Sequence, residues 1–498
     1  MRRHISRLGD EDQPDDVREA AALAILVLCE DAADLVREGG IEPLVALLDQ
    51  SSSASDAARG AAAMALARAA AKTAARQAVA EAGGIEALVA FLGADSTGAG
   101  AAAEALMYLA KDHKDAIAEA GGIEKLVGVA SDGATTNAKR FAAGALRNLT
   151  CHNAANKAAI VSAGGVPVLL RLVAETAETA EEAAGALANI ARRDNATRLA
   201  VADAGAARVL VSAAASGART PASRAMAAET LAVIACAEKS KTQIALAGGA
   251  DALLELLALD DARTQAATAL RNLTCGPRHP RVLGLVRPGI PALVGVLAPD
   301  TEDCAKEAAI ATLIHLAIED AATAHLVVEA GAVAALLRVL EEQHAPLNGA
   351  AVEATALLRT LAFYPEHRAS VGAAMPLLVG LADEQRARPL ELALAALANI
   401  LADHQPNQLR FQQIPGAVPL LLKLAGGAAA TPLAIQHARG ALKNLLASSF
   451  GGVDLPTGDG IDLPTGDGID LPTGDGIDSH IIPSKLPEHW SYSSFTAS

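Results

Sequence analysis

Five asparagines are the side chains of this 498-residue sequence best suited to recognition chemistry. Each occupies the same place in a recurring apolar segment, Ala-Leu-x-Asn followed by Leu or Ile: Asn148, Asn189, Asn272, Asn399 and Asn444. A carboxamide offers N–H donors and an oxygen acceptor, which match the C=O and N–H of a peptide unit. An asparagine near a helix end can instead satisfy a neighbouring loop of its own chain, and both interpretations stay open.

Basic side chains follow the same periodicity. Three stand nine residues after an asparagine of the set: Lys157, Arg198 and Arg281. Others directly precede the asparagine or its equivalent: Arg147, Arg271, Arg359 and Lys443. They predict a positive stripe, although ordinary solvated basic residues would give the same pattern. Because the net charge is −16, a local stripe favours acidic or phosphorylated protein segments over nucleic acid, whose phosphates the remaining surface would repel.

Motifs for catalysis are missing from the sequence. It contains no glycine-rich phosphate loop, Cys-x-x-Cys pair, His-Glu-x-x-His or strand-turn-helix nucleophile motif. The twelve histidines are scattered without a shared ligand spacing. Asp459, Asp467 and Asp475 recur eight residues apart but lack the spacing and closing glutamate of an EF-hand loop. We therefore expect no enzymatic activity, no metal and no cofactor.

The elements that position these side chains come from an internal repeat. A small residue pair followed by an apolar segment returns at intervals of 38 to 44 residues, which indicates stacked helical units. The second residues of the pairs are Gly40, Gly84, Gly122, Gly165, Ala206, Gly249, Gly289, Ala332, Ala373 and Ala417. The pair predicts a helix end in a left-handed cap, and a proline such as Pro167 often opens the next helix. The alanine- and leucine-rich helix that carries each asparagine needs a neighbouring repeat to cover it.

These residues resemble a known family. Residues 142–151, running on through Asn156-Lys157 to Gly164-Gly165-Val166-Pro167, resemble an armadillo repeat of the catenin-like and vacuolar-armadillo-like kind, and the resemblance covers roughly residues 16–449. It implies an all-α, right-handed superhelical solenoid of ten to eleven repeats. Its third helices would line a concave groove that binds extended partner segments, and the five asparagines would form a ladder along the peptide backbone.

We call the asparagine place the ladder position. Along the repeats it is held by Val27, Arg68, Tyr108, Asn148, Asn189, Val233, Asn272, His315, Thr360, Asn399 and Asn444. Lys157 matches a lysine that in catenins pairs with acidic residues of partners. Importin-α is similar but adds a tryptophan four residues before each asparagine, where this chain has Gly144, Gly185, Thr268, Ala395 and Gly440. Two alternatives to a general scaffold stay open. One is a nuclear-import adaptor, and the other is the substrate-binding subunit of a ubiquitin-ligase or signalling complex. A ligase would need a U-box or F-box, for which the segments outside the repeats are too short.

The ends of the chain differ from the repeats. We predict a flexible segment over 1–15, the solenoid over 16–449 and a disordered low-complexity tail over 450–498. The tail holds three copies of Asp-Leu-Pro-Thr-Gly-Asp-Gly-Ile, at 454–461, 462–469 and 470–477. One hypothesis is that these acidic copies occupy the basic groove, and another is that residues 481–492 are docking segments.

The sequence also suggests where the protein works. It shows no signal peptide and no long uncharged apolar run, and Arg2 excludes N-myristoylation. The five cysteines are odd in number and far apart, so we interpret them as reduced, buried and structural. We expect a monomeric protein-interaction adaptor without a membrane anchor, in the cytoplasm with the nucleus as a second compartment.

Overall fold

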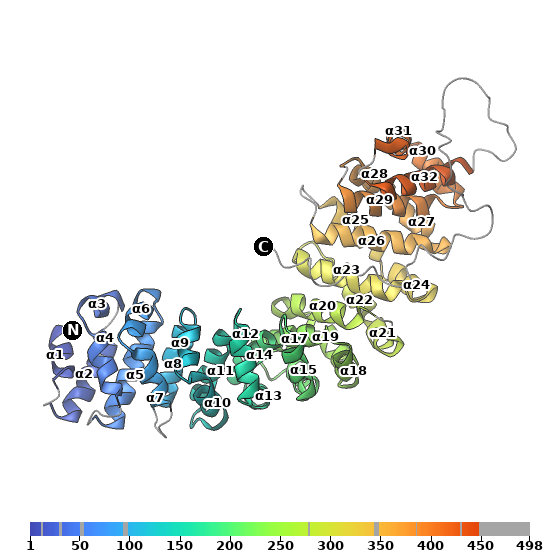
Figure 1. The fold of residues 1–498 in the computed structure, drawn as a ribbon. Coiled ribbons are helices and arrows are strands. Elements are labelled where there is room, and N and C mark those ends of the chain that lie inside the picture. Colours follow the sequence, from blue (N-terminus) through green and yellow to red (C-terminus); the bar gives the residue numbers. More distant parts are fainter. Residues whose placement is uncertain are drawn as a thin grey trace.

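The protein is an elongated, curved row of short helices (Figure 1). A computed structural model describes residues 1–10, 13–28, 32–49, 54–92, 98–276, 279–342, 348–384, 386–428 and 431–447. No strand occurs in these ranges. The predicted tail over 450–498 and Cys29 lie outside the described residues.

The described helices repeat in triplets. The first helices are α3 (Ala32–Arg37), α6 (Thr73–Glu81), α9 (Lys114–Glu119), α12 (Ala154–Ser162), α15 (Asn195–Asp203), α18 (Glu238–Leu246), α21 (Pro280–Val286), α24 (Ala321–Glu329), α27 (Arg368–Val371) and α30 (Gln405–Gln412). The second helices are α4 (Ile41–Leu48), α7 (Gly84–Phe91), α10 (Gly122–Asp132), α13 (Gly165–Glu175), α16 (Ala206–Ala215), α19 (Gly249–Leu256), α22 (Ile290–Gly295), α25 (Ala332–Glu341), α28 (Met375–Asp383) and α31 (Ala417–Lys423).

The third helices are the longest and pack on one another along the whole row. They are α5 (Asp56–Ala70), α8 (Ala99–Leu109), α11 (Thr136–Thr150), α14 (Ala177–Ala191), α17 (Pro221–Ile234), α20 (Asp260–Thr274), α23 (Asp303–Ala317), α26 (Gly349–Phe363), α29 (Ala387–Leu401) and α32 (Pro432–Ala447). Before them, α1 (Arg2–Leu8) and α2 (Asp15–Leu28) form a partial unit, in which α2 packs on α5 as a third helix would. The structure is thus an all-α solenoid, as the sequence predicts, with ten full triplets among the described residues.

Burial within the row comes from small and branched apolar side chains. On α11, Ala142, Ala145, Leu146 and Leu149 are all fully buried, and the apolar residues of neighbouring repeats continue the same core from end to end. Alanines let the helices approach closely, and leucines fill the space between repeats. Since each unit is covered by its neighbours, stability comes from stacking rather than from one central core.

The two glycines of the pair have different structural roles, as the fourth full repeat shows. Gly164 has φ 73°, a left-handed conformation that other residues rarely adopt, and so it allows the sharp turn between α12 and α13. Gly165 has ordinary helical geometry, but a Cβ there would lie 2.6 Å from Ile160 Cγ2. Two short 3-10 helices, η1 (Arg287–Gly289) and η3 (Gly372–Ala374), replace the left-handed turn in the seventh and ninth repeats.

Polar caps begin many of the helices. The side chains of Thr135, Thr176 and Thr220 accept backbone N–H groups at the starts of α11, α14 and α17. Asn153 and Asp194 do the same for α12 and α15. These contacts satisfy N–H groups that have no partner within their own helix.

The N-terminal segment differs from its prediction. Residues 1–15 were expected to be flexible, yet Arg2–Leu8 form α1, with Ile5 and Leu8 buried. These two side chains are three residues apart, so they lie on one face of the helix and join the core of the first triplet. Burial of that apolar face explains why the segment is ordered.

Two further helices, η2 (Pro365–His367) and the π-helix η4 (Leu424–Ala428), complete the described elements. Within the described ranges, no single helix has the length and apolar composition to cross a membrane. The pairs α12 with α13 and α24 with α25 reach those limits only together, and each pair is bent, by 83° and 66° respectively.

Candidate functional site

The five predicted asparagines lie near the ends of α11, α14, α20, α29 and α32. Each Nδ2 donates a hydrogen bond to the carbonyl of the residue just before the ladder position on the preceding third helix. The distances are 2.8 Å for Asn148, 3.1 Å for Asn189, 2.9 Å for Asn272, 3.1 Å for Asn399 and 2.9 Å for Asn444. Most of these carbonyls lie in a last helical turn, where intrahelical donors run out. Each asparagine therefore bridges two repeats.

This contact leaves part of the amide unused at four positions. Asn148, Asn189, Asn399 and Asn444 are half-buried, and no described protein group bonds their Oδ1 atoms. Each keeps an acceptor and a second N–H donor near the surface. Asn272 is only 5% exposed and has little amide surface to offer. The bridging contact to their own chain and the predicted peptide contact are therefore compatible at four of the five sites.

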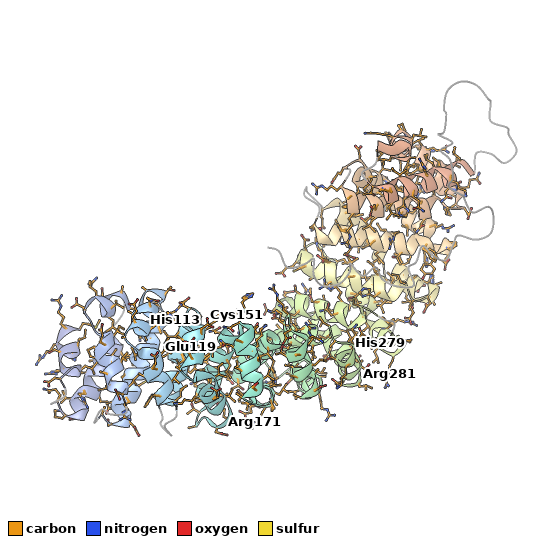
Figure 2. All side chains as sticks on the ribbon, viewed as in Figure 1. His113, Glu119, Cys151, Arg171, His279 and Arg281 are labelled. Atoms are coloured by element: carbon orange, nitrogen blue, oxygen red, sulfur yellow. The ribbon has the colours of Figure 1, made fainter. Side chains whose placement is uncertain are left out.

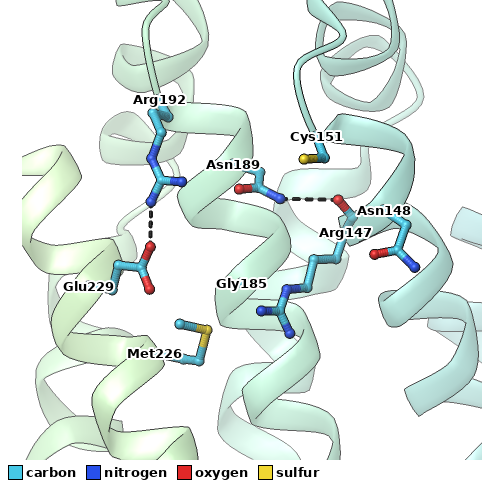
Figure 3. A pocket seen from close by; sticks show the side chains of 8 residues that line it. All are labelled: Arg147, Asn148, Cys151, Gly185, Asn189, Arg192, Met226 and Glu229. Atoms are coloured by element: carbon cyan, nitrogen blue, oxygen red, sulfur yellow. Dashed lines mark hydrogen bonds and ion pairs between the residues drawn. The ribbon is translucent and has the colours of Figure 1, made fainter. Parts of the chain in front are cut away.

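A cleft of about 290 Å³ lies between α11, α14 and α17, beside Asn148 and Asn189 (Figure 3). Its lining residues are Arg147, Asn148, Cys151, Gly185, Asn189, Arg192, Met226 and Glu229. The side chain of Arg147 lies across Gly185. A Cβ atom on Gly185 would therefore come within 2.7 Å of Arg147 Nε. Met107 likewise covers Gly144, because its Sδ lies 2.6 Å from the position that a Cβ on Gly144 would take. At both places a side chain of the previous repeat covers the surface of the third helix at the glycine. We call this surface the floor of the third-helix row.

The predicted positive stripe is largely neutralised in the structure. Arg147 Nη1 lies 3.2 Å from Glu182 Oε2, one repeat further along. Arg271 Nη1 lies 3.7 Å from Glu307 Oε1 in the same arrangement. Arg192 pairs with Glu229 inside the cleft, as Figure 3 shows. The charge of the predicted stripe is therefore partly neutralised here, because Arg147, Arg192 and Arg271 each meet a glutamate on the next third helix.

Lys157 has a structural contact instead of a free charge. Its Nζ donates to the carbonyl of Arg192, the C-cap residue of α14, at 2.7 Å, and the side chain is buried. Burial is the main reason that the pKa of Lys157 is lowered, and the nearby Arg192 adds to the shift. Lys114 and Arg368 make the same contact to the C-cap carbonyls of α11 and α29, at 2.6 and 2.7 Å. A cation at a helix C-terminus is favourable because the last carbonyls carry partial negative charge.

The other two predicted cations are not equivalent to each other. Arg198 occupies the same place in α15 as Lys157 in α12, four residues after the N-cap, and its Nε is buried without a hydrogen-bond partner among the described residues. Arg281 instead lies exposed on α21, well away from the cleft (Figure 2). The common nine-residue spacing therefore does not bring Lys157, Arg198 and Arg281 onto one surface.

His315 replaces asparagine at the ladder position of α23. Its Nδ1 lies 2.9 Å from Thr274 Oγ1 at the end of the preceding third helix, so it also bridges two repeats. Burial lowers the pKa of His315 to about 4, and the charges of Arg271 and Lys241 act in the same direction. The imidazole is therefore neutral at physiological pH.

The cysteines are less buried than the sequence suggests. Cys151, Cys236 and Cys275 are half-buried free thiols, and Cys304 is exposed. Cys151 and Cys275 both form C-caps of third helices, which explains their matching places in the repeats. Among the described residues, no group of three His, Cys, Asp or Glu side chains could hold a metal ion.

Comparison with solved structures places the fold beside two proteins. An engineered protein is 27% identical with a TM-score of 0.65, and the match covers 89% of this chain and 98% of that one. A structure from work on a phosphorylation switch that controls the interaction between cadherin and beta-catenin has a TM-score of 0.69 at 18% identity, with 90% of this chain and 91% of that one covered.

The family model for the armadillo/beta-catenin-like repeat matches residues 153–192, which run from the N-cap of α12 to the C-cap of α14. These residues form an armadillo/beta-catenin-like repeat, one unit of the longer row. A comparison of its sequence with curated proteins returns no significant match. The matched repeat also contains Asn189, Lys157 and one wall of the cleft.

Proposed function

We propose that this armadillo-repeat protein is an interaction scaffold that holds an extended segment of a partner protein along its third helices and does no chemistry of its own. The observation that carries the proposal is the pair of partly used amides, Asn148 and Asn189, beside the cleft. Each still has a donor and an acceptor for a passing peptide unit. The same groups would bind backbone without selecting a side chain.

The repeat geometry suits an extended chain. Neighbouring packed helices are about 8–10 Å apart, and an extended chain advances about 3.3 Å per residue. A bound segment would therefore advance about three residues for each repeat. The cleft between α11 and α17 then offers room for a side chain between the two asparagines.

Charge narrows the choice of partner. Acidic or phosphorylated side chains of a bound segment would compete with Glu182 and Glu229 for Arg147 and Arg192. The net charge of −16 favours a protein segment over nucleic acid, since the rest of the surface repels phosphates. We propose a monomeric adaptor that acts on such segments in the cytoplasm or the nucleus.

The test compares Asn189→Ala with Asn272→Ala in affinity capture from the source cell. Both substitutions remove a bridge of about 3 Å to the preceding helix, at 3.1 and 2.9 Å respectively. Only Asn189 also offers amide surface to a ligand, because Asn272 is buried. Asn189→Ala should weaken partner binding about fivefold or more, whereas Asn272→Ala should leave it close to wild type.

Thermal unfolding of both variants serves as the control, because they should lose similar stability. If both variants keep every partner, the third-helix surface is not the binding site. If both lose partners in proportion to lost stability, the asparagines act only as bridges between repeats.

A further inference from the structure

Near the C-terminal end of the third-helix row, Arg359 on α26 has no ion pair to the next third helix among the described residues. Arg359 precedes the ladder position on α26, as Arg147 and Arg271 do on their helices. Those two arginines have glutamate partners, whereas no carboxylate of the described residues lies within ion-pair distance of Arg359. The place of Glu182 in the next repeat is held by Leu392, seven residues before Asn399.

The nearby carboxylates are already engaged. Glu353, on the same helix as Arg359, pairs with Arg388 at 3.6 Å. Glu391 accepts a hydrogen bond from Thr431 Oγ1 at 2.6 Å. Arg359 is half-buried, and desolvation lowers its pKa, while the charge of Glu353 acts in the opposite direction.

An uncovered patch of the row lies on α32, two third helices further along, where the charge of Arg359 still reaches His437. Gly440 on α32 holds the same place as Gly144 and Gly185, four residues before a ladder asparagine. Among the described residues, no atom lies within 4 Å of the point where a Cβ on Gly440 would stand, because the covering residue of the previous repeat is the short Ala398. The floor is therefore open where the central repeats are covered.

Two cations lie near the opening, and the charge of Glu391 also reaches the ring of His437 beside it. Lys443 is exposed one turn after Gly440, and no ion pair of Lys443 exists among the described residues. His437 lies one turn before Gly440, and the charge of Arg359 reaches its ring. Asn444 keeps a free acceptor and donor beside them. This combination of two cations, an amide and an open floor is suited to a carboxylate ligand.

The chain itself supplies such a ligand directly after α32. Residues 450–498 contain seven aspartates and one glutamate against one lysine, and six of those aspartates belong to the three repeated copies. The first, Asp454, is seven residues beyond Ala447, a span of up to about 23 Å when extended. Returning from Ala447 to Gly440 along the helix requires only about 10 Å. A tethered ligand at this range has an effective concentration in the millimolar range.

We propose that the surface around Gly440, between Arg359 and Lys443, is an anion-binding site whose ligand is an aspartate of this chain's own 454–477 repeats. The tail then occupies the C-terminal end of the row. Because the three repeated copies have the same sequence, an aspartate of any one copy can bind. The inference rests on the proposed function, because the same row of helices would hold the partner segment. A partner that uses the last repeats must displace the tail.

The test measures a labelled peptide against the full-length protein. The probe is a fluorescein-labelled, amidated peptide of residues 454–469, followed by anisotropy at low salt. One variant carries Asn in place of the six repeat aspartates, Asp454, Asp459, Asp462, Asp467, Asp470 and Asp475. It should bind the peptide about tenfold more tightly than wild type, because its own tail no longer competes.

Two further changes in that neutral-tail background locate the site. Arg359→Gln with Lys443→Gln should cost about tenfold in affinity, the range expected for charge-assisted hydrogen bonds. Arg281→Gln, at an exposed arginine on α21, should change the affinity less than twofold and controls for the loss of a positive charge away from the site.

Three results would overturn the inference. Equal peptide affinity of the wild-type and neutral-tail proteins would mean that the site is empty in the free protein and serves a partner's acidic segment. Unchanged affinity of the Arg359 and Lys443 variant would place the peptide elsewhere. A wild-type protein that sediments as a dimer, beside a monomeric neutral-tail variant, would place the tail in a second copy. None of these results affects the comparison of Asn189 with Asn272, which tests the proposed function separately.

Discussion

Gly185 and Gly440 occupy the same place in two repeats, yet their surroundings differ. Over Gly185 lies Arg147, which is held by Glu182. Within the part of the chain that the structure describes, nothing lies over Gly440, and Arg359 on α26 has no ion pair. The helices and ladder asparagines are alike in both regions. The difference teaches that function in such a row depends on which residue the previous repeat supplies. At Gly185 the third helix is covered by a side chain of the preceding repeat, whereas at Gly440 it is uncovered among the described residues.

The largest expected effect separates a structural lysine from a surface lysine. Lys157→Met removes the ammonium that caps α14 and leaves the Arg192 carbonyl without its donor, at a cost of about 2 kcal/mol. Lys443→Met changes an exposed lysine and should stay within about 0.5 kcal/mol. Urea unfolding followed by circular dichroism measures both. Equal losses would mean that Lys157 does not stabilise the central region through this contact.

The next effect depends on pH. The folded state lowers the pKa of His315 from 6.5 to about 4, so the unfolded chain binds more protons between these values. Stability should therefore fall as pH drops from 7 to 5, by about 1 kcal/mol for this partly exposed residue. His315→Asn places the amide of the other repeats here and should reduce that loss. Unfolding at pH 7 and pH 5 measures the difference, and an unchanged slope would show that His315 does not cause it.

A matched pair of alanine substitutions tests the open and covered floors directly. Gly440→Ala should stabilise α32 by up to about 1 kcal/mol, because alanine favours helix and the added Cβ meets no atom. Gly185→Ala gains the same helix propensity but must displace Arg147 from its place beside Glu182. Its net change should be near zero or unfavourable. If the two substitutions gave equal stabilisation in urea unfolding, the covering of Gly185 would have no energetic consequence.

The smallest effect concerns the arginines themselves. Arg147→Gln removes a partly exposed ion pair and should cost about 0.5 kcal/mol at low salt, less at high salt. In the neutral-tail background, Arg359→Gln breaks no ion pair of the described residues and should cost less than Arg147→Gln. Thermal melts at two salt concentrations are sufficient to rank them. A larger loss at Arg359 would indicate a counterion that the present account lacks.

The fold could be predicted from the sequence because its signals are local. The Gly164-Gly165 pair and the Ala-Leu-x-Asn segment each report the conformation of their own few residues, and both recur with the repeat period. The ladder asparagines were placed on the correct helices for the same reason. The sequence could not decide whether these amides bind a peptide or their own chain, because one amide can bond to either. The bridges to the preceding helix belong to the second interpretation.

The charge pattern could not be derived in the same way. Arg147 and Glu182 are 35 residues apart, and Arg271 and Glu307 are 36 apart. Their pairing depends on how one repeat is set against the next, which no local motif states. A search of the sequence for a glutamate about 35 residues after each of these arginines would have found both ion pairs. It would also have shown that Leu392 leaves Arg359 without a glutamate at the place of Glu182.

The measurement that tests the central claim most directly is cross-linking with benzophenone side chains introduced at Met107, Met226 and, as a control, Leu246. Met107 and Met226 lie on the third helices α8 and α17, three repeats apart, whereas Leu246 is exposed at the end of the first helix α18. An extended partner should cross-link from the first two sites at residues about nine apart in its own sequence, and not from Leu246. Cross-links from both sites to the same partner residues, or to Leu246 alone, would contradict the account.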